Sequence, residues 1–332
     1  MMRIGRCSLA PGMSPMVIAE IGVNHLGDYA VAVEMIVTAA KCGAHAIKLQ
    51  RHIPSSEMTT GVPHAVHSTI ARASFSFDDE RSLKKLTEDL GLVYLSTPFS
   101  VLAVQQLVEM GVVAFKVGSG EVTHVPMLTE IAKHRLPVLL STGMATFTEI
   151  WTALQILDVC PVILMHCVSM YPTPYTRVQL RKIDALRREF GVPVGISDHS
   201  EGICIAFGAV AHGARVIEKH FMLEGQACPD SAVSITPQQL TDLVRGAGAV
   251  HSAEYGSNDY QPFPEELEVA KWARHSVTTL RPVAPGDVFT ADNLGCKRPG
   301  TGLAPARLAD LMGKLAAREL PTDTQITEAD YT

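Results

Sequence analysis

Aromatic residues, runs of basic residues and long hydrophobic stretches are all scarce or absent in this 332-residue sequence. No window approaches the roughly 18 apolar residues of a membrane-spanning helix, and the amino terminus lacks the apolar core of a signal peptide. Lys and Arg together number 28 against 34 for Asp and Glu, which gives a formal net charge of −6. We therefore expect neither nucleic acid nor a membrane as a partner, and we predict a globular, cytoplasmic protein.

Closely spaced cysteine pairs and a dinucleotide-binding glycine motif are also missing. The seven cysteines are scattered and never form a C-x-x-C pair. This spacing argues against a disulfide scaffold or a zinc site made of thiolates, and it favours a reducing compartment. No G-x-G-x-x-G sequence follows the first predicted strand, so a Rossmann fold has little support.

The sequence does contain a regular alternation of short apolar runs and longer helical segments. Runs that are apolar nearly throughout are typical of strands buried on both faces of a parallel sheet. We predict eight such strands, at residues 16–23, 46–50, 93–98, 114–120, 138–144, 162–172, 192–200 and 214–221. Eight strand–helix units in about 250 residues indicate an α/β protein built on a (β/α)₈ TIM barrel, and not an open doubly wound sheet.

The pattern changes near the carboxyl end of the chain. We predict a barrel catalytic domain at residues 1–252, a polar and turn-rich linker at 253–275, and a small β-rich domain at 276–332. A domain of fewer than about 60 residues is small for an independent hydrophobic core. We therefore expect this last segment to dock onto something larger.

Polar side chains crowd the carboxyl ends of the predicted strands, which meet at one mouth in a parallel barrel. A ring of buried charges is costly unless the ring performs a function. The residues of this ring are Glu20, Asn24, Lys48, Gln50, Lys116, Ser119, Glu121, Ser141, Thr142, His166, Ser169, Tyr171, Asp198, His199, Glu218 and His220.

Lys48 and Lys116 lie within otherwise apolar predicted strands. Together with nearby hydroxyls and glycines, such as Ser119, Ser141 and Gly143, they indicate a site for a phosphate or a carboxylate. Two other interpretations stay open: each ammonium group reaches solvent at the barrel end, or one lysine forms a Schiff base as in aldolases.

His199 and His220 end the seventh and eighth predicted strands, each near a carboxylate, Asp198 and Glu218. Two imidazoles on neighbouring strand ends predict a divalent metal site that keeps positions open for substrate and water. The alternative is that each is a hydrogen-bonded core histidine. Because no cysteine lies alongside, Mn²⁺ or Mg²⁺ fits at least as well as Zn²⁺.

Three acidic residues, Glu20, Glu121 and Asp230, are candidates for a general acid, a general base or an anchor for a hydroxyl group. The alternative is that they neutralise the two lysines in an ion-pair network. Tyr171 lies in the sequence Tyr-Pro-Thr-Pro-Tyr, where it could serve the site or only pack a loop stiffened by proline.

These stretches resemble the sialic acid synthase family, which comprises N-acetylneuraminate synthases and their legionaminate and pseudaminate counterparts. The matching segments are IAEIGVNHLG, AIKLQ, LSTPFS, AFKVGSGE, LSTGM, HCVSMYPTPY, GISDHS and VIEKHF. The tail, with GDVFTADNLGCKRPGTG, resembles the antifreeze-protein-like (SAF) domain of that family. The resemblance covers nearly the whole chain in the right order. It implies a barrel that condenses phosphoenolpyruvate with an open-chain N-acyl-mannosamine-type sugar, with C–O cleavage, to give a nine-carbon 2-keto acid and phosphate.

The same resemblance implies a role for individual residues and a metal requirement, typically Mn²⁺, with Mg²⁺ or Co²⁺ as alternatives. The residues expected to bind phosphoenolpyruvate are Lys48, Lys116, Ser119, Ser141 and Ser169, and those expected to bind the metal are His199 and His220. The residues expected to be catalytic are Glu20, Glu121, Tyr171 and Asp230. The residues expected to meet the sugar are Gln50, Tyr171, Asp230 and Arg298, the last from the partner subunit of a domain-swapped homodimer.

Three positions depart from the family pattern. The loop at residues 51–77 is shorter than in many members, Cys228 stands where the family usually has Gly, and Ser169 replaces the Asn of some members. The first two leave the identity of the sugar open. Two other classes of function also stay open: a Schiff-base aldolase of the sialic acid type that uses Lys48 or Lys116, and a non-catalytic sugar-binding or ice-binding protein.

Overall fold

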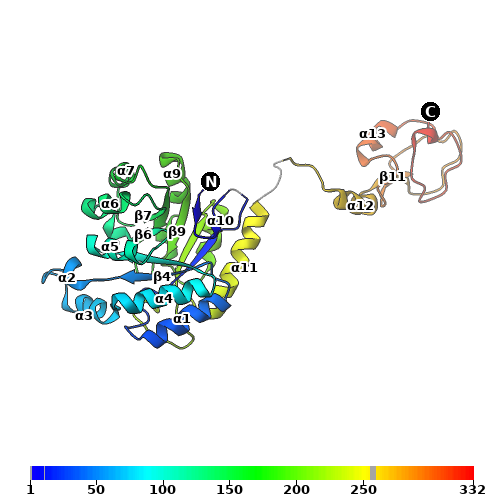
Figure 1. Ribbon diagram of the computed structural model, residues 1–332. Helices are drawn as coiled ribbons and strands as arrows, with labels where there is room; N and C mark the ends of the chain where they lie inside the picture. The colour runs from blue at the N-terminus through cyan, green and yellow to red at the C-terminus, as the bar shows by residue number, and fades with distance from the viewer. Residues whose placement is uncertain (1, 11, 255–258) are drawn as a thin grey trace. The chain divides into compact units, whose positions relative to one another are not determined.

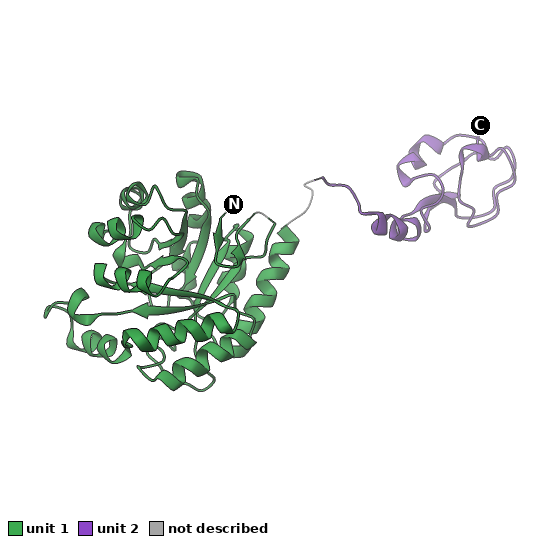
Figure 2. Cartoon of the chain, viewed as in Figure 1, with its two compact units in different colours: residues 1–256 green, residues 257–332 purple. Residues whose placement is uncertain are grey.

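The computed structural model describes residues 2–10, 12–254 and 259–332, and the chain forms two compact units, residues 1–256 and 257–332 (Figure 2). Each unit is described by itself. In the described parts of the chain no helix combines the length and the hydrophobicity needed to cross a membrane.

The first unit is built around a sheet that contains, among the described residues, eight parallel strands in the order β5-β4-β3-β10-β9-β8-β7-β6 (Figure 1). Their bounds are β3 (Met16–Glu20), β4 (Ala46–Arg51), β5 (Val93–Pro98), β6 (Phe115–Val117), β7 (Val138–Ser141), β8 (Val162–Cys167), β9 (Val194–Asp198) and β10 (Val216–His220). The two end strands, β5 and β6, also lie in contact, so the sheet curls into a nearly closed barrel. The predicted TIM-barrel class is confirmed.

Helices cover the outside of the sheet and follow the strands along the chain (Figure 1). The main ones are α1 (Tyr29–Lys41), α4 (Phe77–Asp89), α5 (Val101–Glu109), α6 (Val125–Ala132), α7 (Phe147–Ile156), α9 (Arg181–Phe190), α10 (Cys204–Ala211) and α11 (Pro237–Glu254). The same unit also contains α2 (Pro54–Glu57), α3 (His64–Ala73), α8 (Tyr175–Val178) and the 3₁₀ turn η1 (Ser119–Glu121). Side-chain caps from Asp28, Ser76, Ser100 and Thr146 satisfy the first N–H groups of α1, α4, α5 and α7.

Two apolar layers hold this unit together. The larger lies between the strands and the helices, and a smaller one fills the barrel itself. A hairpin of β1 (Arg3–Ile4) and β2 (Cys7–Ser8) contributes Ile4 to the inner layer, where Ile4 joins Met16 at the start of β3. This hairpin therefore packs against the amino-terminal end of the barrel, opposite the carboxyl ends of the strands.

The second unit contains α12 (Pro264–Ala273), the antiparallel pair β11 (Ser276–Thr279) and β12 (Leu294–Lys297), α13 (Leu308–Leu311) and the 3₁₀ turns η2 (Pro305–Arg307) and η3 (Glu328–Asp330). It has an apolar cluster of its own, which includes Val277, Phe289, Leu311 and Ile326. Part of the linker expected at 253–275 is therefore helical: Pro264 suits a first helical position, and Glu266 bonds back to the N–H of Phe263.

Candidate active site

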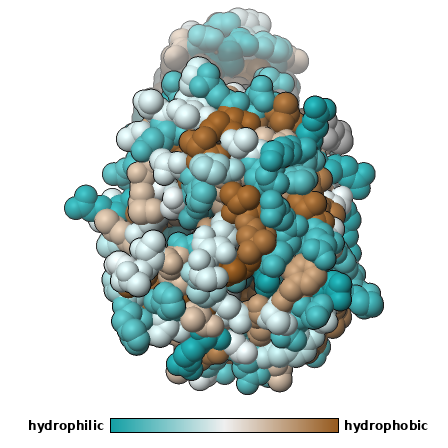
Figure 3. Space-filling model, turned by 60° about the vertical axis from the view of Figure 1, so that its left-hand side comes forward, coloured by the Kyte–Doolittle hydropathy of each residue, from teal (hydrophilic) through white to brown (hydrophobic). Residues whose placement is uncertain are grey.

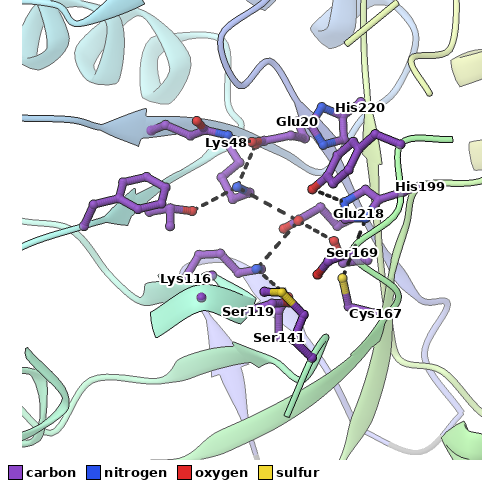
Figure 4. Close-up of a pocket in the computed structure, with 18 residues that line it drawn as sticks. Glu20, Lys48, Lys116, Ser119, Ser141, Cys167, Ser169, His199, Glu218 and His220 are labelled. Atoms are coloured by element: carbon purple, nitrogen blue, oxygen red, sulfur yellow. Dashed lines mark hydrogen bonds and ion pairs between the residues drawn. The ribbon is translucent and has the colours of Figure 1, made fainter. Parts of the chain in front are cut away.

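A polar cavity of about 270 Å³ opens among the carboxyl ends of the barrel strands (Figure 4). Its lining residues are Glu20, Lys48, Gln50, Thr97, Phe99, Lys116, Gly118, Ser119, Gly120, Ser141, Met144, Cys167, Ser169, Tyr171, Ser197, His199, Glu218 and His220. The structure therefore brings ten of the predicted site residues to one cavity, among them both lysines and both histidines.

The two lysines converge on one carboxylate. Lys48 and Lys116 are 3% and 2% exposed, and their Nζ atoms lie 4.0 and 3.7 Å from Oε1 of Glu218. Figure 4 shows them pointing toward Glu218 from different strands. Lys48 also contacts Glu20 at 2.9 Å and donates to the Thr97 hydroxyl, and Lys116 donates to the Ser141 hydroxyl at 2.7 Å. Neither ammonium group reaches bulk solvent, which excludes the interpretation that they emerge from the barrel end.

The electrostatic environment of the two amines differs. Burial raises the pKa of the neighbouring Glu20. Burial lowers the pKa of Lys116, and the negative charge of Glu218 offsets this lowering only in part. For Lys48 burial acts in the same direction, but Glu20 and Glu218 outweigh it and raise the Lys48 pKa. Burial would raise the pKa of Glu218, yet the two lysines lower it to about 2. Lys116 is thus the amine that a bound anion would stabilise most.

A tight turn of small residues lies beside Lys116. The N–H of Gly143 donates to the Ser119 hydroxyl at 3.0 Å. A Cβ atom on Gly143 would come within 2.5 Å of Oγ of Ser169 and 2.7 Å of Oγ of Ser119, so a larger residue there would force both hydroxyls to move. Three predicted anion-binding residues, Ser119, Ser141 and Ser169, therefore line the same cavity as Lys116.

The two histidines lie next to each other, with ring centroids 5.3 Å apart. His199 Nδ1 donates to the carbonyl of Val168 at 2.9 Å, and its Nε2 accepts from the Tyr171 hydroxyl at 3.1 Å. His220 Nδ1 lies 3.2 Å from Oδ2 of Asp230. Both rings therefore have Nδ1 next to an oxygen, which leaves Nε2 of His220 for a ligand. On His199 a ligand at Nε2 would replace the Tyr171 hydroxyl.

Asp230 is held in place by an asparagine that lies outside the cavity lining. Asn24 is fully buried, and its Nδ2 donates to the Phe221 carbonyl and the Ser234 hydroxyl, both at 2.9 Å. Its Oδ1 accepts the N–H of Asp230 at 3.1 Å. Only a side chain with both a donor and an acceptor makes all three bonds.

Several sequence predictions need correction. Glu121 is absent from the cavity lining; it belongs to η1, where burial raises its pKa and Glu57 adds to that rise. Asp198 does not orient His199 directly, because its carboxylate bonds to Lys219 at 3.1 Å. The carboxylate beside His220 is Asp230, since Glu218 faces the lysines.

Two lining residues without a role predicted from the sequence, Thr97 and Ser197, hold charged members of the site. Thr97 accepts from Lys48 at 2.9 Å, and Ser197 donates to Glu218 at 2.9 Å. Their position at the carboxyl ends of predicted strands was the available signal. Arg298, by contrast, lies in the second unit, where its exposed guanidinium faces the Trp272 ring at 5.9 Å.

Apolar side chains accompany this polar site. A second cavity of about 380 Å³ shares Met144, Cys167 and Ser169 with the first and is also lined by Phe147 and Met170. Met144, Phe147 and Met170 are also among the exposed hydrophobic residues. In Figure 3, which turns the left-hand side of Figure 1 forward, hydrophobic patches lie among hydrophilic residues on that face.

The fold and the cavity define a TIM-like barrel with buried ammonium groups, hydroxyls and paired imidazoles at the carboxyl ends of its strands, where barrel enzymes have their active sites. A model described as the NeuB family matches residues 35–259, and a SAF domain model matches residues 274–332. The chain belongs to the NeuB family and ends in a SAF domain, which confirms the resemblance to sialic acid synthases.

Individual relatives and a solved structure are similar to most of the chain. The chain is 37% identical over 316 residues to an uncharacterized protein of Methanocaldococcus jannaschii, covering 94% of this chain and 93% of that protein. It is 32% identical over 338 residues to N,N'-diacetyllegionaminic acid synthase of Legionella pneumophila, covering 95% and 94%. A crystal structure of N-acetylneuraminic acid synthetase from Leptospira borgpetersenii matches with a TM-score of 0.74 and 32% identity, over 81% of this chain and 94% of that one.

Proposed function

We propose that this protein condenses phosphoenolpyruvate with an open-chain N-acyl-mannosamine-type sugar to give a nine-carbon 2-keto acid and inorganic phosphate. The observation that carries the proposal is the convergence of two buried lysines and two histidines on one cavity. The kinship with synthases of sialic-type acids supports the same reaction class.

In this proposal the lysine side of the cavity takes phosphoenolpyruvate. Lys116 and Lys48 supply the charge for its phosphate and carboxylate, and Ser119, Ser141 and Ser169 supply hydroxyl donors. Thr97 and Ser197 hold Lys48 and Glu218 in their present orientation. The charges of Lys48 and Lys116 are already neutralised by Glu20 and Glu218 when no ligand is bound. An anion binds only if it can replace these ion pairs.

His199 and His220 would hold the divalent ion, with Asp230 oriented against His220. The combination of imidazole nitrogen with nearby carboxylate oxygen suits Mn²⁺ or Mg²⁺. The expectation that no cysteine lies alongside was wrong, because Sγ of Cys167 is 3.8 Å from Nδ1 of His199. Within the described residues no group of three or more His, Cys, Asp or Glu side chains is arranged to hold a metal ion, so water or substrate would complete the coordination. When bound, such an ion supplies Lewis-acid polarisation of the sugar aldehyde.

The chain's own residues then act on the reacting atoms. Carbon 3 of phosphoenolpyruvate attacks the aldehyde carbon of the sugar, and positive charge develops on carbon 2. The buried carboxylates of Glu20 and Glu218 favour that transient cation. Water adds to carbon 2, the C–O bond to phosphate breaks, and Lys116 and Lys48 stabilise the leaving anion. Holding both substrates in register contributes several kcal/mol, by order of magnitude, to lowering the barrier.

A Schiff-base aldolase is the second candidate, because burial lowers the pKa of Lys116 and thereby favours its neutral, nucleophilic form. Borohydride treatment in the presence of pyruvate distinguishes the two proposals. A stable adduct on Lys116, with activity that survives EDTA, would replace the synthase by the aldolase.

The synthase is tested by incubating the full chain with phosphoenolpyruvate, Mn²⁺ and a panel of N-acyl-mannosamines. We expect phosphate release only when a sugar is present, with a nine-carbon keto acid detected by mass spectrometry. The Lys116→Met variant should release none. Release that does not depend on a sugar, or no release with any panel member, would contradict the proposal.

We further propose that the active form is a domain-swapped homodimer in which Arg298 of the partner subunit completes the sugar side. The Lys116→Met and Arg298→Ala variants should each lose activity alone. In a co-expressed mixture, each mixed dimer would contain one site with both residues intact, which restores about a quarter of the wild-type activity. A mixture no more active than the two variants measured separately would refute the swap.

A further inference from the structure

A histidine outside the cavity lining connects the cavity to the segment that follows β4. His52 is 6% exposed and comes directly after β4. Its Nδ1 lies 2.8 Å from Oε1 of Glu57, at the end of α2, and its Nε2 lies 2.9 Å from Oε1 of Gln50. The Glu57 side chain is also 6% exposed, so little water separates this pair.

The orientation of the Gln50 amide determines whether Nε2 of His52 donates or accepts a hydrogen bond. Gln50 Nε2 donates to Oε1 of Glu20 at 2.8 Å. The other oxygen of that carboxylate, Oε2, contacts Nζ of Lys48 at 2.9 Å, so the Gln50 amide faces an ion-paired carboxylate. An amide oxygen in that position would face oxygens only, so the NH₂ group must point to Glu20 and the Gln50 oxygen must point to His52.

His52 consequently has an acceptor oxygen at each ring nitrogen: the amide oxygen of Gln50 and the carboxylate of Glu57. A neutral imidazole carries one N–H and can satisfy only one of them, whereas an imidazolium donates to both. We infer that His52 is an imidazolium that locks the Gln50 amide with its NH₂ group toward the cavity, and that it acts as a positioning residue for sugar recognition.

The surroundings of the ring are consistent with a fixed cation. His52 stacks on Phe99 with centroids 4.1 Å apart and planes at 11°, and Phe99 itself lines the cavity. The other titratable groups nearby are His25 and Glu121. Burial, together with the charge of His52, lowers the pKa of His25 to about 4, so His25 adds no positive charge at neutral pH. Burial raises the pKa of Glu121, and the neighbouring Glu57 adds to that rise.

This lock has a consequence for substrate choice, and the consequence rests on the proposed function. One N–H of Gln50 is used by Glu20, and the second belongs to an atom at the cavity wall. With the amide fixed, Gln50 presents a donor and never an acceptor at that position. It therefore selects a sugar with an acceptor oxygen there, a hydroxyl or an acyl carbonyl, and it makes no demand on phosphoenolpyruvate.

The test uses two substitutions of His52 in the full chain. His52→Phe keeps the stack on Phe99 and removes both donors, so kcat/KM for the sugar should fall about tenfold or more while KM for phosphoenolpyruvate stays within about twofold. His52→Gln restores one N–H donor toward Gln50 and should recover part of the loss. In a Gln50→Ala background, His52→Phe should have almost no further effect, because the histidine acts through that amide. Equal losses for both substrates, or multiplicative losses in the double variant, would overturn the positioning role.

The charge of His52 is tested without any turnover. In protein labelled with ¹⁵N-histidine, the resonances that disappear in His52→Phe should carry the signature of two protonated ring nitrogens at pH 7.5. One protonated and one bare nitrogen would overturn the inference even if the enzyme is active. If the wild-type chain shows no sugar-dependent turnover, the proposed function fails while this measurement still decides the charge of His52.

Discussion

The Lys116→Met variant distinguishes two possible roles of Lys116: binding the anionic substrate, or only neutralising the charge of Glu218. The side chains have similar length, and Lys116 is 2% exposed, so methionine fills the space without a charge. Removing one partner of a buried ion pair costs about 3–5 kcal/mol. Because Lys48 remains 4.0 Å from Glu218, we expect the cost to lie at the low end, and a protein of about 5–15 kcal/mol stability stays folded.

The effect on an anion should be larger than the effect on folding. A hydrogen bond to a charged group is worth about 1.5–3 kcal/mol, which corresponds to a loss of phosphoenolpyruvate affinity of about 10- to 150-fold. A ligand at 100 times its Kd stabilises a protein by about 2.7 kcal/mol, and after a 100-fold loss of affinity the same concentration gives only about 0.4 kcal/mol.

Isothermal titration calorimetry and ligand-dependent thermal unfolding measure both quantities. The matched control is Lys133→Met, because Lys133 forms an exposed ion pair with Glu130 on the surface of the barrel. If Lys116→Met binds phosphoenolpyruvate as tightly as the control does, the reasoning is refuted and Lys116 is a counter-ion. A Lys116→Met, Glu218→Gln double variant that regains stability without regaining affinity would support the separation of the two roles.

Further predictions concern the glycine turn, the loop after β3 and the buried amide. Gly143→Ala should weaken phosphoenolpyruvate binding about tenfold in calorimetry, whereas Gly248→Ala in α11, whose Cβ would meet only Oγ of Ser14 at 3.9 Å, should leave it unchanged. Burial lowers the pKa of His25 from 6.5 to about 4, so its contribution to stability is complete above pH 6.5 and is lost as pH falls toward 4. Urea unfolding at pH 7.5 and at pH 5 measures how much unfolding free energy is lost between the two. This loss should be about 2 kcal/mol smaller in His25→Gln than in the wild type, and equal losses would contradict the prediction. Asn24→Asp should raise KM for the sugar about tenfold and leave that for phosphoenolpyruvate unchanged in steady-state assays, since aspartate keeps the acceptor for the Asp230 N–H but loses the donors to the Phe221 carbonyl and the Ser234 hydroxyl; parallel rises would contradict it.

The barrel was predictable because its signal is local. A strand buried on both faces must be apolar along its length, so runs such as Val138–Ser141 can be recognised in the sequence. Eight such strands in succession, separated by helices, are compatible with few folds. The positions of Lys48 and Lys116 on such strands were equally informative, since parallel strand ends share one mouth. Helix α12 was missed because its exposed, polar composition resembles a linker.

The partners of the charged groups were not predictable in the same way. Asp198 and Glu218 are each one or two residues from a site histidine, and the sequence suggested that they orient those rings. In the structure successive residues of a strand point to opposite faces, so Asp198 turns outward to Lys219 while Glu218 turns inward to the lysines. The carboxylate beside His220 is instead Asp230, which lies in the loop after β10 and not on a strand. Asn24 holds that loop in place through the N–H of Asp230.

The amino-acid sequence by itself determined the barrel, the end of the barrel where chemistry can occur, and the residue types gathered there, because strand burial and strand direction follow from local hydrophobic pattern. Only the tertiary structure decided which carboxylate meets which cation, that Glu121 lies outside the cavity, and that His52 and Gln50 share a hydrogen bond next to Glu20. Those outcomes depend on side-chain direction and on loops that meet across the barrel, where a few ångströms decide between a contact and none.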